Sequence, residues 1–274
     1  MFPLEFKIAD IQVAITLQHN ENFWHWQDMK DAVLLTVDAH NDTGDFAPYE
    51  TRLSRLLAYI TGETQFICSA VHYGCVSSVY WLNPHSESLP LQYTGDVRLV
   101  EGVPRLKTKV IEHSGKKYIS WGEESQNMVV EPEEETAMLE TIADIHRGIG
   151  AIVTAEQIDI PESRPFILDV DLDGFCCFYG EKYSPAGHDG ISGWQKRIRE
   201  TRDVLKQLRE PDLITITRSC STNGMKWVPP GLVDEVQHKF LRVLYELYDP
   251  KDTLKDWILR GVWDKSRELE KQYA

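Results

Sequence analysis

Long apolar runs are missing from this 274-residue sequence, because none approaches the roughly 20 residues that a membrane-spanning helix needs. The first residues, MFPLEFKIADIQVAITL, also lack the basic start and long apolar stretch of a secretion signal. The five cysteines are an odd number without CxxC spacing, so we interpret them as buried thiols in a reducing compartment. These features predict a cytoplasmic protein with no membrane partner.

Basic residues are also scarce, since 29 lysines and arginines face 43 aspartates and glutamates and leave a net charge of −14. A general nucleic-acid binder needs a basic face, so no nucleic-acid partner is expected. A negative field attracts cationic ligands, although solubility alone accounts for most of these charges. The GxxxxGK[ST] and HExxH motifs, and a GxGxxG motif opening a helix, are absent, which leaves nucleotide-binding and zincin functions without support.

Apolar runs of strand length alternate with amphipathic helical patterns along the chain. The strands are predicted at 11–17, 32–40, 76–82, 165–173 and 212–219, and the helices at 49–60, 133–149, 193–210, 231–248 and 254–272. The strands are continuously apolar, which indicates a mostly parallel sheet covered on both faces. We therefore predict a single α/β domain over residues 1–274, with three-layer αβα architecture.

Residues 96–122 interrupt this alternation. Turn signals at 102–104 and 113–115 predict two or three short antiparallel strands there. We expect a small antiparallel insertion around 90–125 that leaves the rest of the domain continuous.

The stretch LLTVDAHNDTGDF, at 34–46, places Asp38, His40 and Asp42 at alternate positions after an apolar run. Alternate side chains of a strand share one face, so these three groups are expected to converge. Solvated acids at a strand end would give the same pattern in isolation.

A second run, ILDVDLDGF, repeats the device with Asp169, Asp171 and Asp173. Ligands of open parallel sheets bind beyond the carboxyl ends of the strands, where both acidic groups are expected. Carboxylates gathered in one crevice repel each other unless a cation compensates them. Carboxylate and imidazole ligands together suit manganese, iron or zinc, and the two motifs in one chain favour a metal site.

These motifs resemble those of a known superfamily. VDAHNDT, at 37–43, resembles the DAHxD motif of arginases, agmatinases and deacetylases, and LDVDLDGF, at 168–175, resembles their second metal motif. TLQHNENFWHW, at 16–26, and the segment 66–84 resemble the arginase-like branch that includes the peptide arginases of ribosomal-peptide biosynthesis. The resemblance covers about residues 10–85 and 160–235, and it implies an arginase-like fold.

The resemblance also implies a binuclear centre with two Mn²⁺ ions per chain. His19, Asp38, Asp42 and Asp169 would hold one ion, and Asp38, His40, Asp169 and Asp171 would hold the other. Within this scheme Asp38 and Asp169 bridge the ions. Asp173 would either support a ligand or cap a turn, and we adopt the turn-capping interpretation. A hydroxide formed at such a centre attacks the guanidinium carbon of arginine, giving urea and an ornithine side chain.

Two residues are then assigned to proton transfer, and three to the substrate. Asp42 would pass a proton to the leaving amine, and His72 would shuttle protons unless it is only a buried histidine before a strand. Glu21 and Glu181 are candidates for gripping the guanidinium, and Arg218 for a substrate carboxylate or amide. The histidine-bearing HGMP-like loop of free-arginine arginases is missing, which favours an arginine-containing peptide as the substrate.

Two other functions remain open from the sequence. A zinc amidohydrolase of deacetylase type would use one metal and an Asp-His-Asp set, leaving His19 free. A non-catalytic binding protein could keep the same fold. Metal content distinguishes the deacetylase-type enzyme from a binuclear manganese hydrolase. Urea release from an arginine-bearing peptide would exclude the non-catalytic binding protein. The oligomeric state is not predicted.

Overall fold

The computed structural model of the chain describes residues 4–40, 42, 66–72, 74–85, 98–100, 103–105, 108–113, 116–121, 158–178, 190–220, 227–251 and 255–273. The helices predicted at 49–60 and 133–149 lie outside these described residues. The strands and helices predicted elsewhere fall within them, so the α/β prediction can be compared directly with the structure.

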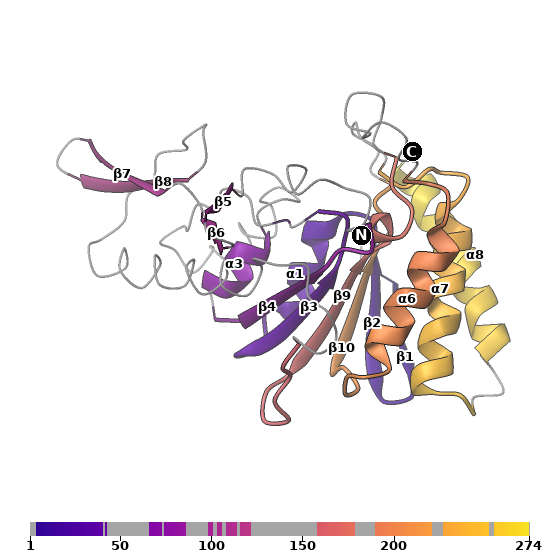
Figure 1. Ribbon diagram of the computed structural model, residues 1–274. Helices are drawn as coiled ribbons and strands as arrows, with labels where there is room; N and C mark the ends of the chain where they lie inside the picture. Colours follow the sequence, from indigo (N-terminus) through magenta and orange to yellow (C-terminus); the bar gives the residue numbers. More distant parts are fainter. Residues whose placement is uncertain are drawn as a thin grey trace.

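A six-stranded sheet forms the centre of the molecule, with the order β1-β2-β10-β9-β3-β4 (Figure 1). The strands are β1 Leu4–Ile8, β2 Ile11–Thr16, β3 Ala32–Val37, β4 Val76–Leu82, β9 Phe166–Asp171 and β10 Leu213–Thr217. Every neighbouring pair in the order β2-β10-β9-β3-β4 is parallel, and β1 pairs antiparallel with β2 at one edge. The predicted mostly parallel α/β sheet is confirmed, whereas β1 was not predicted.

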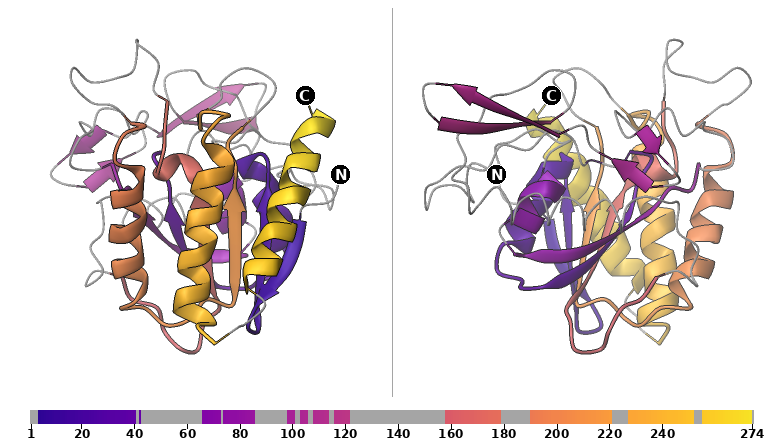
Figure 2. Two further views of the ribbon diagram at one scale, coloured as in Figure 1. Left: turned by 90° about the vertical axis from the view of Figure 1, so that its right-hand side faces the viewer. Right: turned by 60° about the vertical axis from the view of Figure 1, so that its left-hand side comes forward.

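Three long helices cover one face of this sheet. They are α6 Trp194–Leu205, α7 Val233–Tyr248 and α8 Lys255–Tyr273, which lie side by side in Figure 2. On the other side lie the 3-10 helix η1 His19–Asn22 and the helices α1 Phe23–Trp26 and α3 Phe66–His72 (Figure 1). The three long helices confirm the helical predictions for the C-terminal part, and α3 was not predicted. Among the described residues, none of the helices combines the length and the apolar character that crossing a membrane requires.

The central strands present different chemistry to the two sides of the sheet. Leu168 and Val170 of β9 pack into the apolar core that also contains Phe240 of α7. Asp169 and Asp171 alternate with them and therefore point to the opposite face. The same alternation puts a set of buried threonines on that opposite face: Thr16, Thr36, Thr215 and Thr217. The polar face is thus built by strand periodicity, and the apolar face anchors the sheet.

Two short antiparallel pairs lie outside the main sheet. β5 Arg98–Val100 pairs with β6 Val103–Arg105, and β7 Thr108–His113 pairs with β8 Lys116–Trp121. These strands confirm the predicted antiparallel insertion around 90–125, with four strands in two ladders rather than two or three strands.

Candidate metal centre

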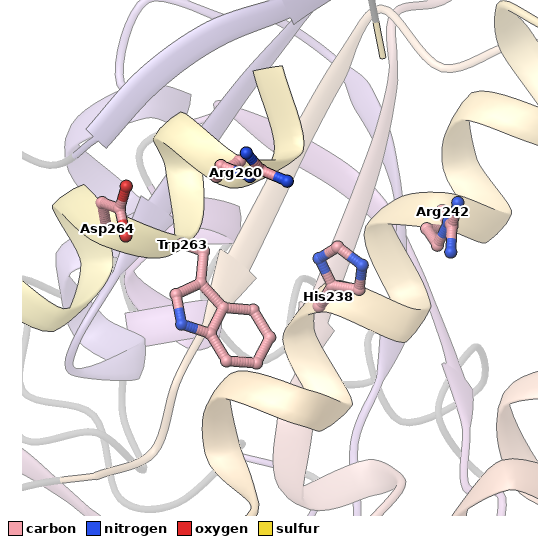
Figure 3. A pocket seen from close by; sticks show the side chains of 5 residues that line it. All are labelled: His238, Arg242, Arg260, Trp263 and Asp264. Atoms are coloured by element: carbon pink, nitrogen blue, oxygen red, sulfur yellow. The ribbon is translucent and has the colours of Figure 1, made fainter. Parts of the chain in front are cut away.

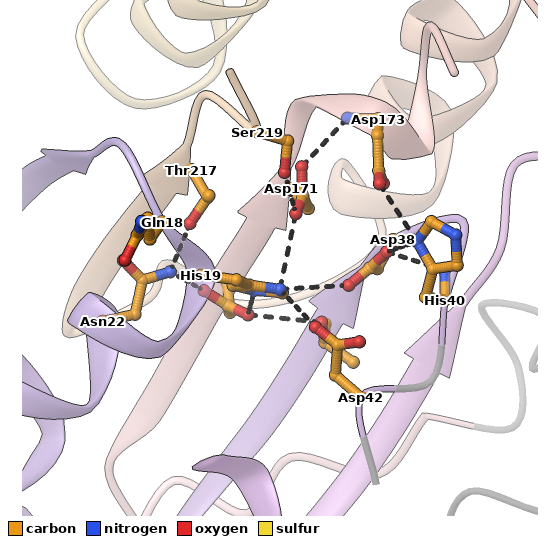
Figure 4. Close-up of polar contacts among 12 residues, drawn as sticks. Gln18, His19, Asn22, Asp38, His40, Asp42, Asp171, Asp173, Thr217 and Ser219 are labelled. Atoms are coloured by element: carbon orange, nitrogen blue, oxygen red, sulfur yellow. Dashed lines mark hydrogen bonds and ion pairs between the residues drawn. The ribbon is translucent and has the colours of Figure 1, made fainter. Parts of the chain in front are cut away.

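A cluster of carboxylates and histidines lies at the carboxyl ends of the parallel strands (Figure 4). β3 leads into Asp38, β9 ends at Asp171, and His19 follows β2 in η1. The central pair β3 and β9 is parallel and in register, with Thr36 opposite Asp169, so both strands finish at the same edge. Segments that are far apart in the sequence are therefore brought together, as the two acidic motifs predicted.

His19 is surrounded by carboxylates and is almost fully buried. Its Nδ1 lies 2.7 Å from Asp42 Oδ2, 3.2 Å from Asp38 Oδ2 and 3.4 Å from Asp171 Oδ2. His19, Asp38 and Asp171 offer ligand atoms that all lie within 4.8 Å of one another, a separation that one cation can span. Asp42 is held in a left-handed backbone conformation, with φ of 46°, beside this group.

His40 marks a second group on the other side of Asp38. Its Nδ1 lies 3.0 Å from Asp173 Oδ2 and 3.5 Å from Asp38 Oδ1. The Trp227 ring packs against the imidazole with centroids 4.6 Å apart. His40, Asp173 and Cys177 form a second set of ligand atoms within 4.8 Å of one another. Asp38 therefore faces one histidine with each of its oxygens.

Asp169 lies among hydrogen-bonding partners, and the bridging role that the resemblance implies remains a prediction. Its Oδ1 accepts hydrogen bonds from Asn22 Nδ2 and Thr215 Oγ1, both at 2.7 Å. Its Oδ2 lies 2.7 Å from His19 Nε2 and accepts a hydrogen bond from Thr36 Oγ1 at 3.3 Å. Four partners thus surround a carboxylate that is 0% exposed. Its contact with Nε2 suits Asp169 to orienting the His19 ring, as carboxylates do when they hold metal-binding histidines in one tautomer.

A buried network of amide and hydroxyl groups supports this arrangement. Asn22 donates to Thr217 Oγ1 at 2.8 Å as well as to Asp169, and its Oδ1 accepts from Thr16 Oγ1 at 2.7 Å. These threonines sit opposite each other in the β2–β10 register. The role of Asn22 was not predicted, because it depends on a strand pairing that the sequence does not display.

The short 3-10 helix η4, Leu172–Gly174, carries Asp173 around to His40. A Cβ on Gly174 would lie 3.0 Å from the backbone N and Cα of Asp38, so only glycine allows this close approach. Asp173 Oδ1 accepts the Ala39 N–H at 3.3 Å, which joins the two acidic motifs directly. In the turn that follows β4, His85 Nε2 lies 3.0 Å from the Asp173 carbonyl oxygen. Neither His85 nor the Gly174 contact was identified from the sequence.

The electrostatics of the cluster are those of carboxylates crowded into a buried space. Burial and the neighbouring Asp38 carboxylate raise the pKa of Asp42 to about 7. Burial likewise raises the pKa of Asp173 to about 6, although His40 opposes the shift. Burial and the Asp173 charge raise the pKa of Asp171 well above its usual value. Without a cation, the cluster therefore retains protons that carboxylates in water would lose.

The crowded carboxylates raise the pKa values of the two histidines. Burial alone would lower the pKa of His19, but the Asp169 carboxylate and hydrogen bonds to its carboxylate neighbours raise it well above the usual value. The pKa of His40 is also raised, because the attraction of Asp173 outweighs burial. Burial would raise the pKa of Asp38, but these two imidazoles lower it below its usual range. Positive charge is thus favoured at both groups.

The residues fit divalent cations at both positions. Asp38 Oδ2 and Asp173 Oδ2 are buried, and neither accepts a hydrogen bond from the described residues. Native proteins seldom leave such atoms without a donor, so each is suited to a metal ion. The surrounding donors are imidazole nitrogens and carboxylate oxygens, the mixture that suits manganese, iron or zinc.

The remaining predicted residues lie in other settings. Glu21 Oε2 accepts the N–H groups of Leu17 and Gln18 at 2.9 and 3.2 Å, which holds the start of η1. Arg218 is fully buried, with Nη2 donating to Asp234 Oδ1 at 2.7 Å and Nη1 donating to Gln237, so it ties β10 to α7. These contacts tie both residues into the fold, and their contact with substrate remains a prediction.

The side chains of two predicted residues, His72 and Glu181, lie outside the described part of the structure. The backbone of His72 ends α3, just before the start of β4, and its side chain lies outside the described part of the structure. Glu181 lies outside the described residues altogether. Their proposed roles in proton shuttling and guanidinium binding remain predictions.

A pocket of about 590 Å³ lies elsewhere, between α7 and α8 (Figure 3). Its lining consists of His238, Arg242, Arg260, Trp263 and Asp264. It contains a single carboxylate, so it does not reproduce the ligand set at the strand ends. The acid–histidine cluster is therefore the stronger candidate for chemistry.

Comparison of the sequence with protein-family models gives no match, and comparison with curated proteins gives none either. We therefore infer function from the geometry of this centre and from the motifs that build it.

Proposed function

We propose that the protein is a binuclear metal-dependent hydrolase that converts arginine side chains of a peptide to ornithine and releases urea. The observation that carries this proposal is the placement of Asp38 between two histidines. Its Oδ2 lies 3.2 Å from His19 Nδ1, and its Oδ1 lies 3.5 Å from His40 Nδ1. A carboxylate placed in this way is suited to bridging two cations.

The geometry supports a ligand set that differs from the predicted one by one aspartate in each position. The first position takes His19, Asp38, Asp42 and Asp171, and the second takes Asp38, His40, Asp171 and Asp173. Asp171 and Asp173 thus take the places expected for Asp169 and Asp171. The reason is that β9 ends at Asp171, whereas Asp169 lies further back in the strand among four hydrogen-bonding partners.

Divalent cations bound here would supply the acidified water that hydrolysis of a guanidinium needs, and the resemblance implies that they are Mn²⁺. Asp42 is suited to holding the transferred proton, because its carboxylate lies at the centre, 2.7 Å from His19 Nδ1. Asp169 holds the His19 ring through Nε2, which leaves Nδ1 turned to the centre. The acidic surroundings attract a cationic guanidinium group.

Several coarser features agree with this proposal. A mostly parallel sheet with helices on both sides suits the three-layer arginase-like architecture that the resemblance implies. The described cysteines Cys75, Cys176, Cys177 and Cys220 form no disulfides, which suits the reducing cytoplasm. A single-metal deacetylase-type centre is less favoured, because His19 is placed among carboxylates instead of being left free.

The activity is tested by incubating metal-loaded protein with a peptide that contains arginine. We expect urea release and a mass loss of CH₂N₂ per converted arginine, and no change in the same peptide carrying lysine at that position. An Asp42→Asn variant serves as the inactive control. Turnover of free arginine without turnover of any arginine peptide would overturn the substrate assignment.

Metal analysis tests the centre independently of the substrate. Purified protein loaded with metal and then dialysed should hold about two divalent ions per chain, as two-metal hydrolases do. One zinc ion per chain would instead support the deacetylase alternative. Two bound ions with no hydrolysis of arginine peptides or acyl-amides would point to a non-catalytic binding protein.

A further inference from the structure

The thiol of Cys177 lies beside the second group of ligands. Its Sγ, a nitrogen of His40 and an oxygen of Asp173 all lie within 4.8 Å of one another. Cys177 is 0% exposed and follows η4 by three residues. The sequence suggested only a buried thiol at this position, since nothing in the order of residues places it near His40.

Adjacent cysteines point in different directions here. Cys176 belongs to the large apolar core that lies against the long helices. Cys177 instead packs with Ala39 and Trp227. Ala39 is the residue between the proposed ligands Asp38 and His40 in the sequence. The two neighbours therefore differ in surroundings, although both are buried cysteines.

The backbone fixes Cys177 in this place. Its N–H donates to the Gly190 carbonyl at 3.0 Å, and the next residue, Phe178, donates to the Trp227 carbonyl at 2.6 Å. The Trp227 ring in turn packs on His40. The thiol and the imidazole are thus held by one connected set of contacts.

The third member of the group has an atom that needs a partner. Asp173 is 1% exposed, and its Oδ1 accepts the Ala39 N–H. Its Oδ2 accepts no hydrogen bond from the described residues, and it faces His40 Nδ1 at 3.0 Å. A cation between the three side chains would satisfy this oxygen.

We propose that the thiolate of Cys177 binds the second cation together with His40 and Asp173, and that this position selects Zn²⁺ over Mn²⁺. The inference rests on the proposed function, because it assumes that His40 and Asp173 hold a cation. Thiolate is a soft ligand that suits zinc, whereas manganese prefers carboxylate and water oxygens. Binding requires loss of the Sγ proton, which passes to solvent.

The two positions therefore differ in chemistry. The first has only nitrogen and oxygen donors, from His19 and its carboxylate neighbours, and it remains suited to Mn²⁺. The second combines nitrogen, oxygen and sulfur, as zinc sites often do. The protein is expected to hold one ion of each kind when both metals are supplied.

Cobalt substitution tests the thiolate ligand directly. Wild-type protein freed of metal and titrated with Co²⁺ should develop the strong near-ultraviolet absorption of a cobalt–thiolate bond. Cys177→Ser should lose this band, and the matched control Cys176→Ser should keep it. Cobalt binding in the wild type without such a band would overturn the proposal while leaving the binuclear centre intact. Absence of any cobalt binding would instead overturn the proposed function.

Competition between metals gives a second readout. Zn²⁺ should displace Mn²⁺ from one of the two positions of the wild type, and Cys177→Ser should weaken zinc binding there by at least ~10-fold. Unchanged zinc affinity in a folded Cys177→Ser would contradict the proposal. X-ray absorption at the zinc edge of the wild type needs no variant, and it should show sulfur at about 2.3 Å. A zinc shell of only nitrogen and oxygen would overturn the assignment.

Discussion

Asp38 and Asp171 make the same turn at the ends of two neighbouring strands. In each case Oδ1 accepts a hydrogen bond from the backbone N–H two residues further on. Asp38 accepts from His40 at 2.7 Å, and Asp171 accepts from Asp173 at 3.0 Å. The other oxygen of each aspartate then faces His19 Nδ1, at 3.2 and 3.4 Å. This local turn orients both carboxylates and also places the next ligand, His40 or Asp173, at the second position.

The first prediction separates Asp173 from Asp169 as ligands. Asp173→Asn should remove a charged ligand and reduce bound metal from about two ions to one. Asp169→Asn should keep both ions but weaken binding by roughly 10–100-fold, because it perturbs the orientation of His19. Metal content after dialysis and titration calorimetry measure these effects.

An exposed aspartate of α6, Asp203, provides the control, and Asp203→Asn should behave as wild type. If Asp169→Asn lost one ion outright while Asp173→Asn retained two, the ligand set predicted from the resemblance would replace the one proposed from the geometry.

The second prediction concerns the contact at Gly174. Gly174→Ala places a Cβ 3.0 Å from the backbone of Asp38, where neither side can give way easily. We expect a loss of about 1–3 kcal/mol in the free energy of unfolding, and weaker metal binding because η4 and Asp173 move outward. Urea unfolding in the presence of a chelator measures the first effect, and metal titration measures the second.

Gly261 in α8 is the matched control, since nothing lies within 4 Å of a Cβ built there. Gly261→Ala should stabilise the protein by about 0.5–1 kcal/mol, as expected for alanine in a helix. Equal effects of the two substitutions would show that the close approach at Asp38 does not matter.

The third prediction is a pH dependence of stabilisation by metal. Asp42 and Asp173 have folded pKa values of about 7 and 6, above the value near 4 expected for an unfolded aspartate. Their contribution to the stability of the metal-free protein is therefore present below about pH 4 and is lost as pH rises through 6 and 7. The raised pKa values of His19 and His40 act in the same direction.

A bound cation replaces these protons and relieves the repulsion that develops at higher pH. The rise in Tm on adding Mn²⁺ should consequently be larger at about pH 8 than at about pH 5.5, each measured against protein with chelator. A rise of equal size at both pH values would contradict the protonation states described for the cluster.

The fourth prediction concerns Arg218. Because its guanidinium donates to Asp234 and Gln237 of α7, Arg218→Met should destabilise the fold by about 2 kcal/mol or more. The KM for an arginine peptide should change little in the fraction that remains folded. Thermal unfolding and steady-state kinetics distinguish this from the predicted contact with substrate, for which KM would rise at constant Tm.

Much of the central sheet could be predicted because β2, β3, β4, β9 and β10 are short segments rich in apolar residues. The edge strand β1 was missed, since its sequence LEFKI alternates between exposed and buried residues. The acidic groups at the strand ends could also be predicted from the two motifs, although it is the β3–β9 register that brings Asp38 beside Asp171.

The choice between Asp169 and Asp173 could not be made from the sequence. All three aspartates of DVDLD alternate, so the outcome depends on where β9 stops, and it stops at Asp171. The positions of Asn22 and Cys177 in the site could not be predicted from the sequence for a related reason. Their neighbours come from strand pairing and from a turn held by Gly190, and no local pattern encodes either.

The proposed ligands of the first position come from η1, the end of β3 and the end of β9, so about 150 residues separate His19 from Asp171 along the chain. An ion that joins them works as a cross-link, closing a loop of the kind that long-range disulfides close. Release of the ion should therefore lower the barrier to separating β3 from β9, and a chelator should speed global unfolding more than it changes the rate at which the β7–β8 pair opens.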